Sequence, residues 1–226
     1  MKNIKDYRIE IITGQYNTAD PQQKALINHL LGDQAQSRFE IYFHWYNIVH
    51  ELGHAVIEWN SEVPLHPAEE EQLVNDFAVA YWRQYGEEAK IKDLCEIVSG
   101  ALSRFTVPDE RMDYMEYAKQ TWGKKELYTF DHYGWFQFSC VQHSLSEHKV
   151  LRQLLSEMGV SGVESQEKRT LQYIADENMP NKVANDAVRI LRGWGAALPE
   201  SVKIIFSEDP NCHMYQAVRK NSAVDQ

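Results

Sequence analysis

Hydrophobic positions along this 226-residue chain recur mostly with the three- and four-residue spacing of amphipathic helices. Together with capping residues and helix-ending Gly and Pro, that spacing predicts helices over approximately residues 21–31, 38–59, 67–85, 91–102, 108–122, 139–158, 167–177 and 182–194. Two β-prone runs, 7–12 and 202–206, predict strands. No internal repeat or linker divides the chain. We therefore expect one mainly α-helical domain over residues 1–226, with a small β-sheet as the α+β alternative.

The predicted helix over residues 38–59 carries an H-E-x-x-H motif at residues 50–54. His50 and His54 are one helical turn apart and lie on the same face, so both imidazoles can bind one Zn²⁺ ion. Glu51 stands beside them, where it can act on a water molecule. In a chain with 9 His among 226 residues, the motif arises by chance with a probability of about 0.03. The alternative is a core helix with two incidentally spaced histidines.

Two local patterns refine the expectation for this helix. Ser37 and Glu40 have the S-x-x-E form of a capping box, which predicts that the helix begins near Arg38. Gly53 inside a helix costs about 1 kcal/mol relative to Ala, so its presence predicts the close approach of another element.

A catalytic zinc site takes three protein ligands, so a third is needed. The next predicted helix offers Glu71, with Asn75 one turn later on the same face, where it can orient a ligand by a hydrogen bond. Two alternatives stay open. Acidic residues in a first helical turn gain about 0.3–1 kcal/mol from the helix dipole without any metal, and the apolar face of this helix passes closer to Glu70. His66, from the preceding loop, is a further possible ligand.

The H-E-L-G-H sequence at residues 50–54, followed by Glu71, Asn75, Phe77 and Ala78, resembles the gluzincin type of zinc peptidase and is most similar to the ImmA/IrrE-type group. The resemblance implies a zincin-like metallopeptidase core around the active-site helix 38–59. It also implies that Glu51 is the catalytic base and that the zinc ligands are His50, His54 and Glu71.

The resemblance covers about residues 37–82 and departs from the family pattern in places. Leu73 and Val74 stand where that pattern has Glu and Ala, and residues 86–226 contribute nothing to it. The metzincin class requires a third His at position 60, where this chain has Asn60, so that class is excluded.

A peptidase of this type also needs a hydrogen-bond donor for the oxyanion of the tetrahedral intermediate. His132 and Tyr133 are the candidates, and His143 and His148 are weaker ones. From the sequence we favour the alternative, in which His132 and Tyr133 belong to an aromatic core segment with a turn at Gly134, because Tyr and Trp bury large areas wherever they occur. His44 is expected to be a core histidine with a satisfied hydrogen bond.

Composition narrows the possible partners. The net charge of −10 and the lack of a Lys/Arg-rich run argue against nucleic acid as a partner. Three widely spaced cysteines, Cys95, Cys140 and Cys212, are expected to be free thiols in a reducing compartment. The chain has neither a signal-peptide pattern nor a run of eighteen apolar residues, so we expect a cytoplasmic protein that does not enter the membrane.

The sequence therefore predicts a zinc-dependent peptidase, either an endopeptidase or an aminopeptidase, that acts on a peptide or protein substrate. A non-catalytic zinc-binding regulatory or interaction protein is the alternative, although the intact Glu51 favours catalysis. A structural zinc site is disfavoured because structural zinc usually has four protein ligands. No pattern in the sequence indicates an oligomeric state.

Overall fold

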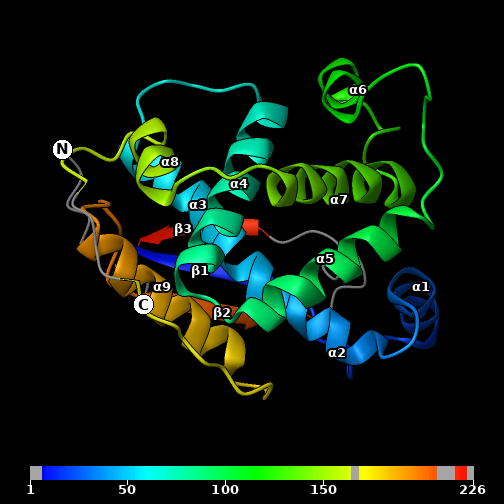
Figure 1. The fold of residues 1–226 in the computed structure, drawn as a ribbon, viewed down its shortest axis with the longest axis horizontal. Coiled ribbons are helices and arrows are strands. Elements are labelled where there is room, and N and C mark those ends of the chain that lie inside the picture. The colour runs from blue at the N-terminus through cyan, green and yellow to red at the C-terminus, as the bar shows by residue number, and fades with distance from the viewer. Residues whose placement is uncertain (1–6, 164–167, 208–216, 223–226) are drawn as a thin grey trace.

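Helices dominate the chain, and a small sheet accompanies them (Figure 1). The computed structural model describes residues 7–163, 168–207 and 217–222. In chain order its elements are β1 (Tyr7–Thr13), α1 (Pro21–Leu31), α2 (Ala35–Phe39), the π-helix η2 (Glu40–Tyr46), α3 (Asn47–Asn60), α4 (Pro67–Tyr85), α5 (Glu88–Leu102), α6 (Tyr114–Thr121), α7 (Phe130–Ser146), α8 (Leu151–Glu157), α9 (Met179–Gly193), β2 (Val202–Phe206) and β3 (Ala217–Ser222). The prediction of a mainly helical fold is confirmed.

The sheet has the order β2-β1-β3. β1 pairs in parallel with β2, with Ile9 opposite Val202, and antiparallel with β3, with Ile9 opposite Lys220. α3 contacts β1 and β3, while α9 contacts β2 and α3. Ile9 and Ile11 alternate along β1 and are buried, because residues two apart point to the same face of a strand. β1 and β2 confirm the predicted strands, whereas β3 was not predicted.

The segment from Ala35 to Asn60 is helical throughout, but it contains a π-helical stretch, η2, just before the H-E-x-x-H motif. The helix begins earlier than the capping box at Ser37 and Glu40 indicated. Gln34 precedes it in the left-handed conformation, with φ of 64°. The turn from α1 into α2 therefore sets the start of the helix, and the capping-box prediction is wrong. π-helical turns are frequent at functional sites.

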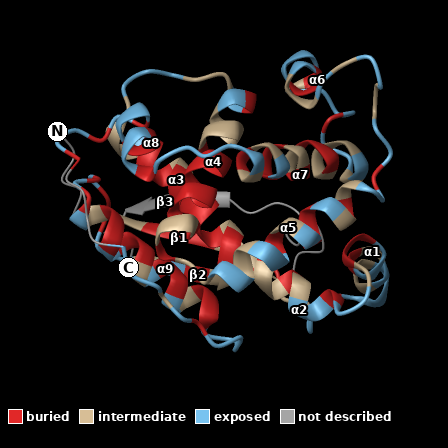
Figure 2. Cartoon of the chain, viewed as in Figure 1, coloured by how far each residue is buried: buried red, intermediate tan, exposed pale blue. Residues whose placement is uncertain are grey.

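α3 and α4 cross at Gly53, where the two backbones approach closely. A Cβ atom on Gly53 would lie 2.9 Å from Cβ of Val74 and 3.0 Å from Cδ1 of Phe77. The predicted close approach is therefore confirmed. Figure 2 shows that buried positions gather where α3 and α4 lie side by side. α4 begins at Pro67 and ends before Gly86, as predicted.

α7 differs most from the prediction. It begins at Phe130 instead of Ser139 and ends at Ser146 instead of Met158. Its end is set by α4: the Arg83 guanidinium donates hydrogen bonds to the carbonyls of Leu145 and Glu147. These contacts satisfy carbonyl groups that a longer helix would have bonded internally.

Gly134 lies inside α7 and forms no turn. A Cβ atom there would lie 2.6 Å from Cζ of Phe105, so Gly134 serves the close packing of that ring.

Two other predicted helices need correction. The helix predicted over residues 167–177 is not formed. Residues 168–175 have no regular secondary structure, and position 167 lies outside the described residues. This segment is held by neighbours: Leu171 N–H donates to the carbonyl of Tyr85, and Lys90 donates to the carbonyl of Tyr173. The helix expected over 108–122 begins only at Tyr114, because Asp113 supplies the N-cap. No helix in the described part of the chain is long and apolar enough to span a bilayer.

Candidate metal centre

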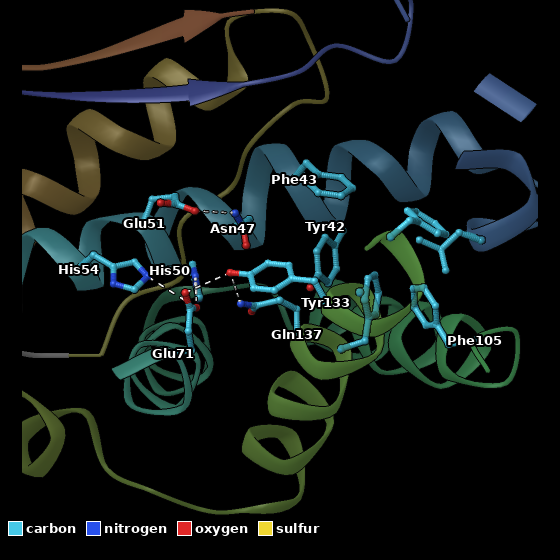
Figure 3. A pocket seen from close by; sticks show the side chains of 14 residues that line it. Tyr42, Phe43, Asn47, His50, Glu51, His54, Glu71, Phe105, Tyr133 and Gln137 are labelled. Atoms are coloured by element: carbon cyan, nitrogen blue, oxygen red, sulfur yellow. Dashed lines mark hydrogen bonds and ion pairs between the residues drawn. The ribbon is translucent and has the colours of Figure 1, made fainter. Parts of the chain in front are cut away.

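Two consecutive helices bring the side chains of His50, His54 and Glu71 together (Figure 3). Nε2 of His50 lies 3.4 Å from Oε2 of Glu71, and Nε2 of His54 lies 3.7 Å from the same oxygen. In a tetrahedral site with metal–ligand distances of about 2.0–2.2 Å, ligand atoms are about 3.3–3.6 Å apart. The two measured distances are therefore close to those that one zinc ion requires.

Oε2 of Glu71 gives an independent indication of a cation. This oxygen is buried and has no hydrogen-bond partner among the described residues. A buried carboxylate oxygen without a hydrogen bond has lost its hydration, so native structures rarely leave one in that state unless positive charge lies beside it. Two imidazole nitrogens face it, and a cation held by the three side chains would supply the missing partner. The residues present therefore fit a zinc ion.

A hydrogen-bond network fixes the orientation of His50. Its Nδ1 lies 3.2 Å from Oδ1 of Asn75, which also accepts a hydrogen bond from the hydroxyl of Tyr46 at 2.8 Å. Nδ2 of Asn75 donates to the backbone carbonyl of Glu71 at 2.8 Å. Because Oδ1 only accepts, Nδ1 of His50 carries the proton, and Nε2 is directed towards Glu71. Asn75 thus has the orienting position predicted from its spacing.

Glu70 and Glu71 have different roles in this arrangement. Oε1 of Glu70 lies 2.7 Å from Nδ1 of His54, on the side of the ring away from the Glu71 carboxylate. A carboxylate that accepts from one ring nitrogen orients the other nitrogen for a metal and raises its basicity. Of these two adjacent carboxylates, Glu71 therefore has the position of a metal ligand, and Glu70 has that of a support for His54.

Electrostatic attraction holds the cluster together. Burial by itself lowers the pKa of His54, but Glu71, Glu70 and Glu51 outweigh it and hold this pKa well above its ordinary value. Burial likewise raises the pKa of Glu71, but His54 and His50 outweigh it, and the pKa lies well below its usual range. Glu71 is therefore ionised, as a ligand must be, and a cation bound by Nε2 of His54 displaces a proton.

Glu51 lies in the same pocket, but it is outside the group of converging ligand atoms. Nδ2 of Asn47, one turn earlier on the helix, donates to Oε1 of Glu51 at 3.2 Å. Burial raises the pKa of Glu51 above its ordinary value, against the opposing attraction of His50 and His54. A carboxylate with a raised pKa is better suited to accept a proton from water near neutral pH.

Tyr133 faces the ligands from α7. Its hydroxyl lies 3.3 Å from Oε1 of Glu71 and accepts a hydrogen bond from Nε2 of Gln137 at 2.9 Å. Burial, followed by the charge of Glu71, raises the pKa of Tyr133 well above its ordinary value. The hydroxyl therefore remains protonated at neutral pH and can donate a hydrogen bond within the pocket.

The other candidate histidines lie away from this cluster. His132 is next to Tyr133 on α7, but adjacent helical residues point in different directions, and its Nδ1 lies 2.7 Å from the hydroxyl of Tyr117. His66 caps α4 by accepting from the N–H of Ala68. His143 and His148 do not line the pocket, and buried His44 lies 2.8 Å from the carbonyl of Gly14, as a core histidine. We therefore omit His132 from the proposed site.

Asn47 and Gln137 were not predicted as site residues, although both follow the helical repeat. Asn47 precedes Glu51 by four residues, and Gln137 follows Tyr133 by four, so each pair shares a face of its helix. A search for polar residues one turn from each candidate would have found them.

Comparison of the chain with protein-family models, with curated proteins and with solved structures finds no match. The resemblance to gluzincins therefore rests on the residues of the sequence motif.

Zinc affinity distinguishes the roles of Glu70 and Glu71. We expect Glu71→Ala to lower the affinity by more than about 100-fold, because it removes a ligand, and Glu70→Ala to lower it by about 10- to 100-fold, because it removes only the support of His54. Glu69→Ala is the matched control, since Glu69 is half-exposed and pairs with Lys119. Titration against a chromogenic chelator measures all three variants. A larger loss for Glu70→Ala than for Glu71→Ala would contradict this assignment.

Proposed function

We propose that this protein is a zinc-dependent peptidase that hydrolyses bonds in a peptide or protein substrate, with a zincin-like core of the gluzincin type formed by α3 and α4. The observation that carries the proposal is the convergence of His50, His54 and Glu71 next to Glu51 in one pocket. Three ligands with a carboxylate beside them are typical of catalytic zinc, which keeps one coordination position free.

Zinc held by these three side chains would polarise the substrate carbonyl and make water a stronger nucleophile. Glu51 accepts a proton from the attacking water and returns it to the leaving nitrogen as the carbon–nitrogen bond breaks. Asn47 holds the Glu51 carboxylate in place by its hydrogen bond. The balance is one water added and one peptide bond cleaved, so no other reactant is needed.

Tyr133 is the proposed donor to the negatively charged oxygen that develops on the substrate carbonyl. Its hydroxyl is at the ligand cluster, where it donates a hydrogen bond to Oε1 of Glu71 and accepts one from Nε2 of Gln137, so its proton is directed towards the ligands. A preorganised donor in a site that excludes water stabilises such an oxyanion strongly.

We also propose a cytoplasmic location. Cys95 and Cys140 are free thiols, as expected in a reducing compartment, while Cys212 lies outside the described residues.

Glu51→Gln separates catalysis from metal binding. The variant keeps the size and hydrogen-bonding capacity of the side chain but cannot accept a proton, so we expect it to bind zinc normally and to lose hydrolysis by at least about 10²- to 10⁴-fold. The measurement is mass spectrometry of a proteome-derived peptide library incubated with each protein, together with zinc analysis. Equal cleavage by both proteins would remove Glu51 from the mechanism, and no cleavage by either would favour the non-catalytic zinc-binding alternative.

Tyr133→Phe tests the oxyanion donor. It removes one hydroxyl, so we expect kcat on a peptide found in the library experiment to fall by about 10²- to 10³-fold while KM and zinc content change little. Tyr117→Phe is the matched control, because its hydroxyl pairs with His132 outside the pocket. An unchanged kcat for Tyr133→Phe would show that Tyr133 only packs in the core.

A further inference from the structure

Gln137 links two groups of the candidate site that lie on different helices. Its side chain, on α7, lines the pocket beside Tyr133 (Figure 3). Nε2 of Gln137 donates to the hydroxyl of Tyr133 at 2.9 Å, and Oε1 of Gln137 accepts from Nδ2 of Asn75 at 3.5 Å. The amide of Gln137 therefore stands between the proposed oxyanion donor and the residue that orients His50.

The contacts of Asn75 determine which way the Gln137 amide faces. Asn75 is buried, its Oδ1 accepts from Tyr46, and its Nδ2 donates to the backbone carbonyl of Glu71, both at 2.8 Å. Asn75 thus presents its NH2 group to Gln137, which faces it with an oxygen. A reversed Gln137 amide would bring two NH2 groups face to face, and an amide NH2 group only donates. Nε2 of Gln137 is therefore directed towards Tyr133.

The hydroxyl of Tyr133 depends more on Gln137 than on Glu71. O–H···O hydrogen bonds are usually about 2.7–2.8 Å long, so the 3.3 Å contact from Tyr133 to Oε1 of Glu71 is long and weak. The 2.9 Å contact from Gln137 has an ordinary length for an N–H···O bond. Because Nε2 of Gln137 only donates, it leaves the tyrosine proton for the ligand side, whereas an amide oxygen in its place would accept that proton.

Asn75, by contrast, is held without Gln137. Its two shorter contacts, with Tyr46 and with the backbone of Glu71, already fix its orientation. The 3.5 Å contact with Gln137 is near the outer limit for a hydrogen bond and adds little to them. Loss of the Gln137 amide should therefore affect Tyr133 and leave the support of His50 in place.

We propose that Gln137 is a positioning residue that transmits the orientation of Asn75 to the hydroxyl of Tyr133. One amide on α4 then sets the direction of both a metal ligand, His50, and the oxyanion donor. The donors run in one direction along this chain, so each hydrogen bond polarises the next and strengthens the last donor. The purpose of the donor rests on the proposed peptidase function, while the hydrogen bonds join side chains of this protein alone.

NMR of the metal-free protein, labelled with ζ-¹³C tyrosine, tests these hydrogen bonds without metal or substrate. Tyr133→Phe and Tyr46→Phe assign the two signals. Gln137→Met keeps the approximate size of the side chain but removes the amide, so we expect it to shift the Tyr133 signal and leave the Tyr46 signal in place. Ser139→Ala is the matched control and should move neither, because the Ser139 hydroxyl donates to the carbonyl of Trp135 within the same helix. An unmoved Tyr133 signal, or an equal shift of the Tyr46 signal, would overturn the proposal.

Binding of acetohydroxamate to the cobalt-loaded protein tests what the hydroxyl does, and the visible spectrum of cobalt reports it without turnover. Tyr133→Phe should weaken binding by about 10- to 100-fold, because it removes a hydrogen bond to a charged oxygen. Gln137→Met should weaken it by about 3- to 10-fold, because it removes one neutral hydrogen bond and keeps the donor. The double variant should lose no more than Tyr133→Phe alone, since Gln137 acts through that hydroxyl.

The outcomes separate this inference from the proposed function. Additive losses in the double variant, or no loss for Gln137→Met, would overturn the positioning role while the metal site stands. Failure to bind cobalt or zinc would refute the proposed function, and the tyrosine signals would then decide the role of Gln137. Gln137→Asn keeps an amide that is too short to reach Tyr133, so it should match Gln137→Met and replaces it if that variant does not fold. Wild-type behaviour of Gln137→Asn would contradict the proposal.

Discussion

The candidate site depends on the contact between α3 and α4 at Gly53. The two helices carry different parts of the ligand set, and only their close crossing brings Oε2 of Glu71 within 3.7 Å of both imidazole Nε2 atoms. A side chain at Gly53 would collide with Val74 and Phe77, so the absence of a Cβ there is what allows this separation. A glycine lowers the stability of α3 relative to alanine, and the close crossing with α4 explains why a glycine is nevertheless present at this position.

Around that contact, each potential ligand has a partner that sets its direction. Asn75 orients His50, Glu70 orients His54, and Tyr133 contacts the Glu71 oxygen that does not face the imidazoles. These partners keep the side chains converged although the cluster buries charge, which is expensive without compensation. One turn of α4 supplies both Glu71 and Asn75, so the helix that provides the carboxylate also orients the imidazole.

Much of the architecture was predictable because local rules determine it. Asp20 and Gln23 form the capping box that starts α1, and Pro67 starts α4. The H-E-x-x-H spacing, Gly53 and the pairing of Glu71 with Asn75 all follow from the helical repeat. The prediction failed where tertiary contacts override local preference. Arg83 ends α7.

The positions of the individual residues of the candidate site were also only partly predictable. The spacing on α4 left Glu70 and Glu71 as alternatives, because their roles depend on which ring nitrogen each one meets across the helix crossing. Tyr133 and His132 were indistinguishable because the extent of α7, and therefore the direction of each side chain, depends on contacts with α4 and α6. The pocket that contains the ligand cluster was not predicted, since residues from 30 to 138 meet there only in the folded chain.

X-ray absorption spectroscopy of the zinc-loaded protein tests the central claim most directly, because it reports the ligand atoms around the ion without any assay of activity. We expect about four nitrogen or oxygen neighbours at about 2.0–2.2 Å, two of them with the multiple-scattering signature of imidazole and none of them sulfur. We also expect His50→Ala to leave one imidazole signature. A spectrum with sulfur ligands, or one unchanged by His50→Ala, would contradict the convergence of His50, His54 and Glu71 on a single ion.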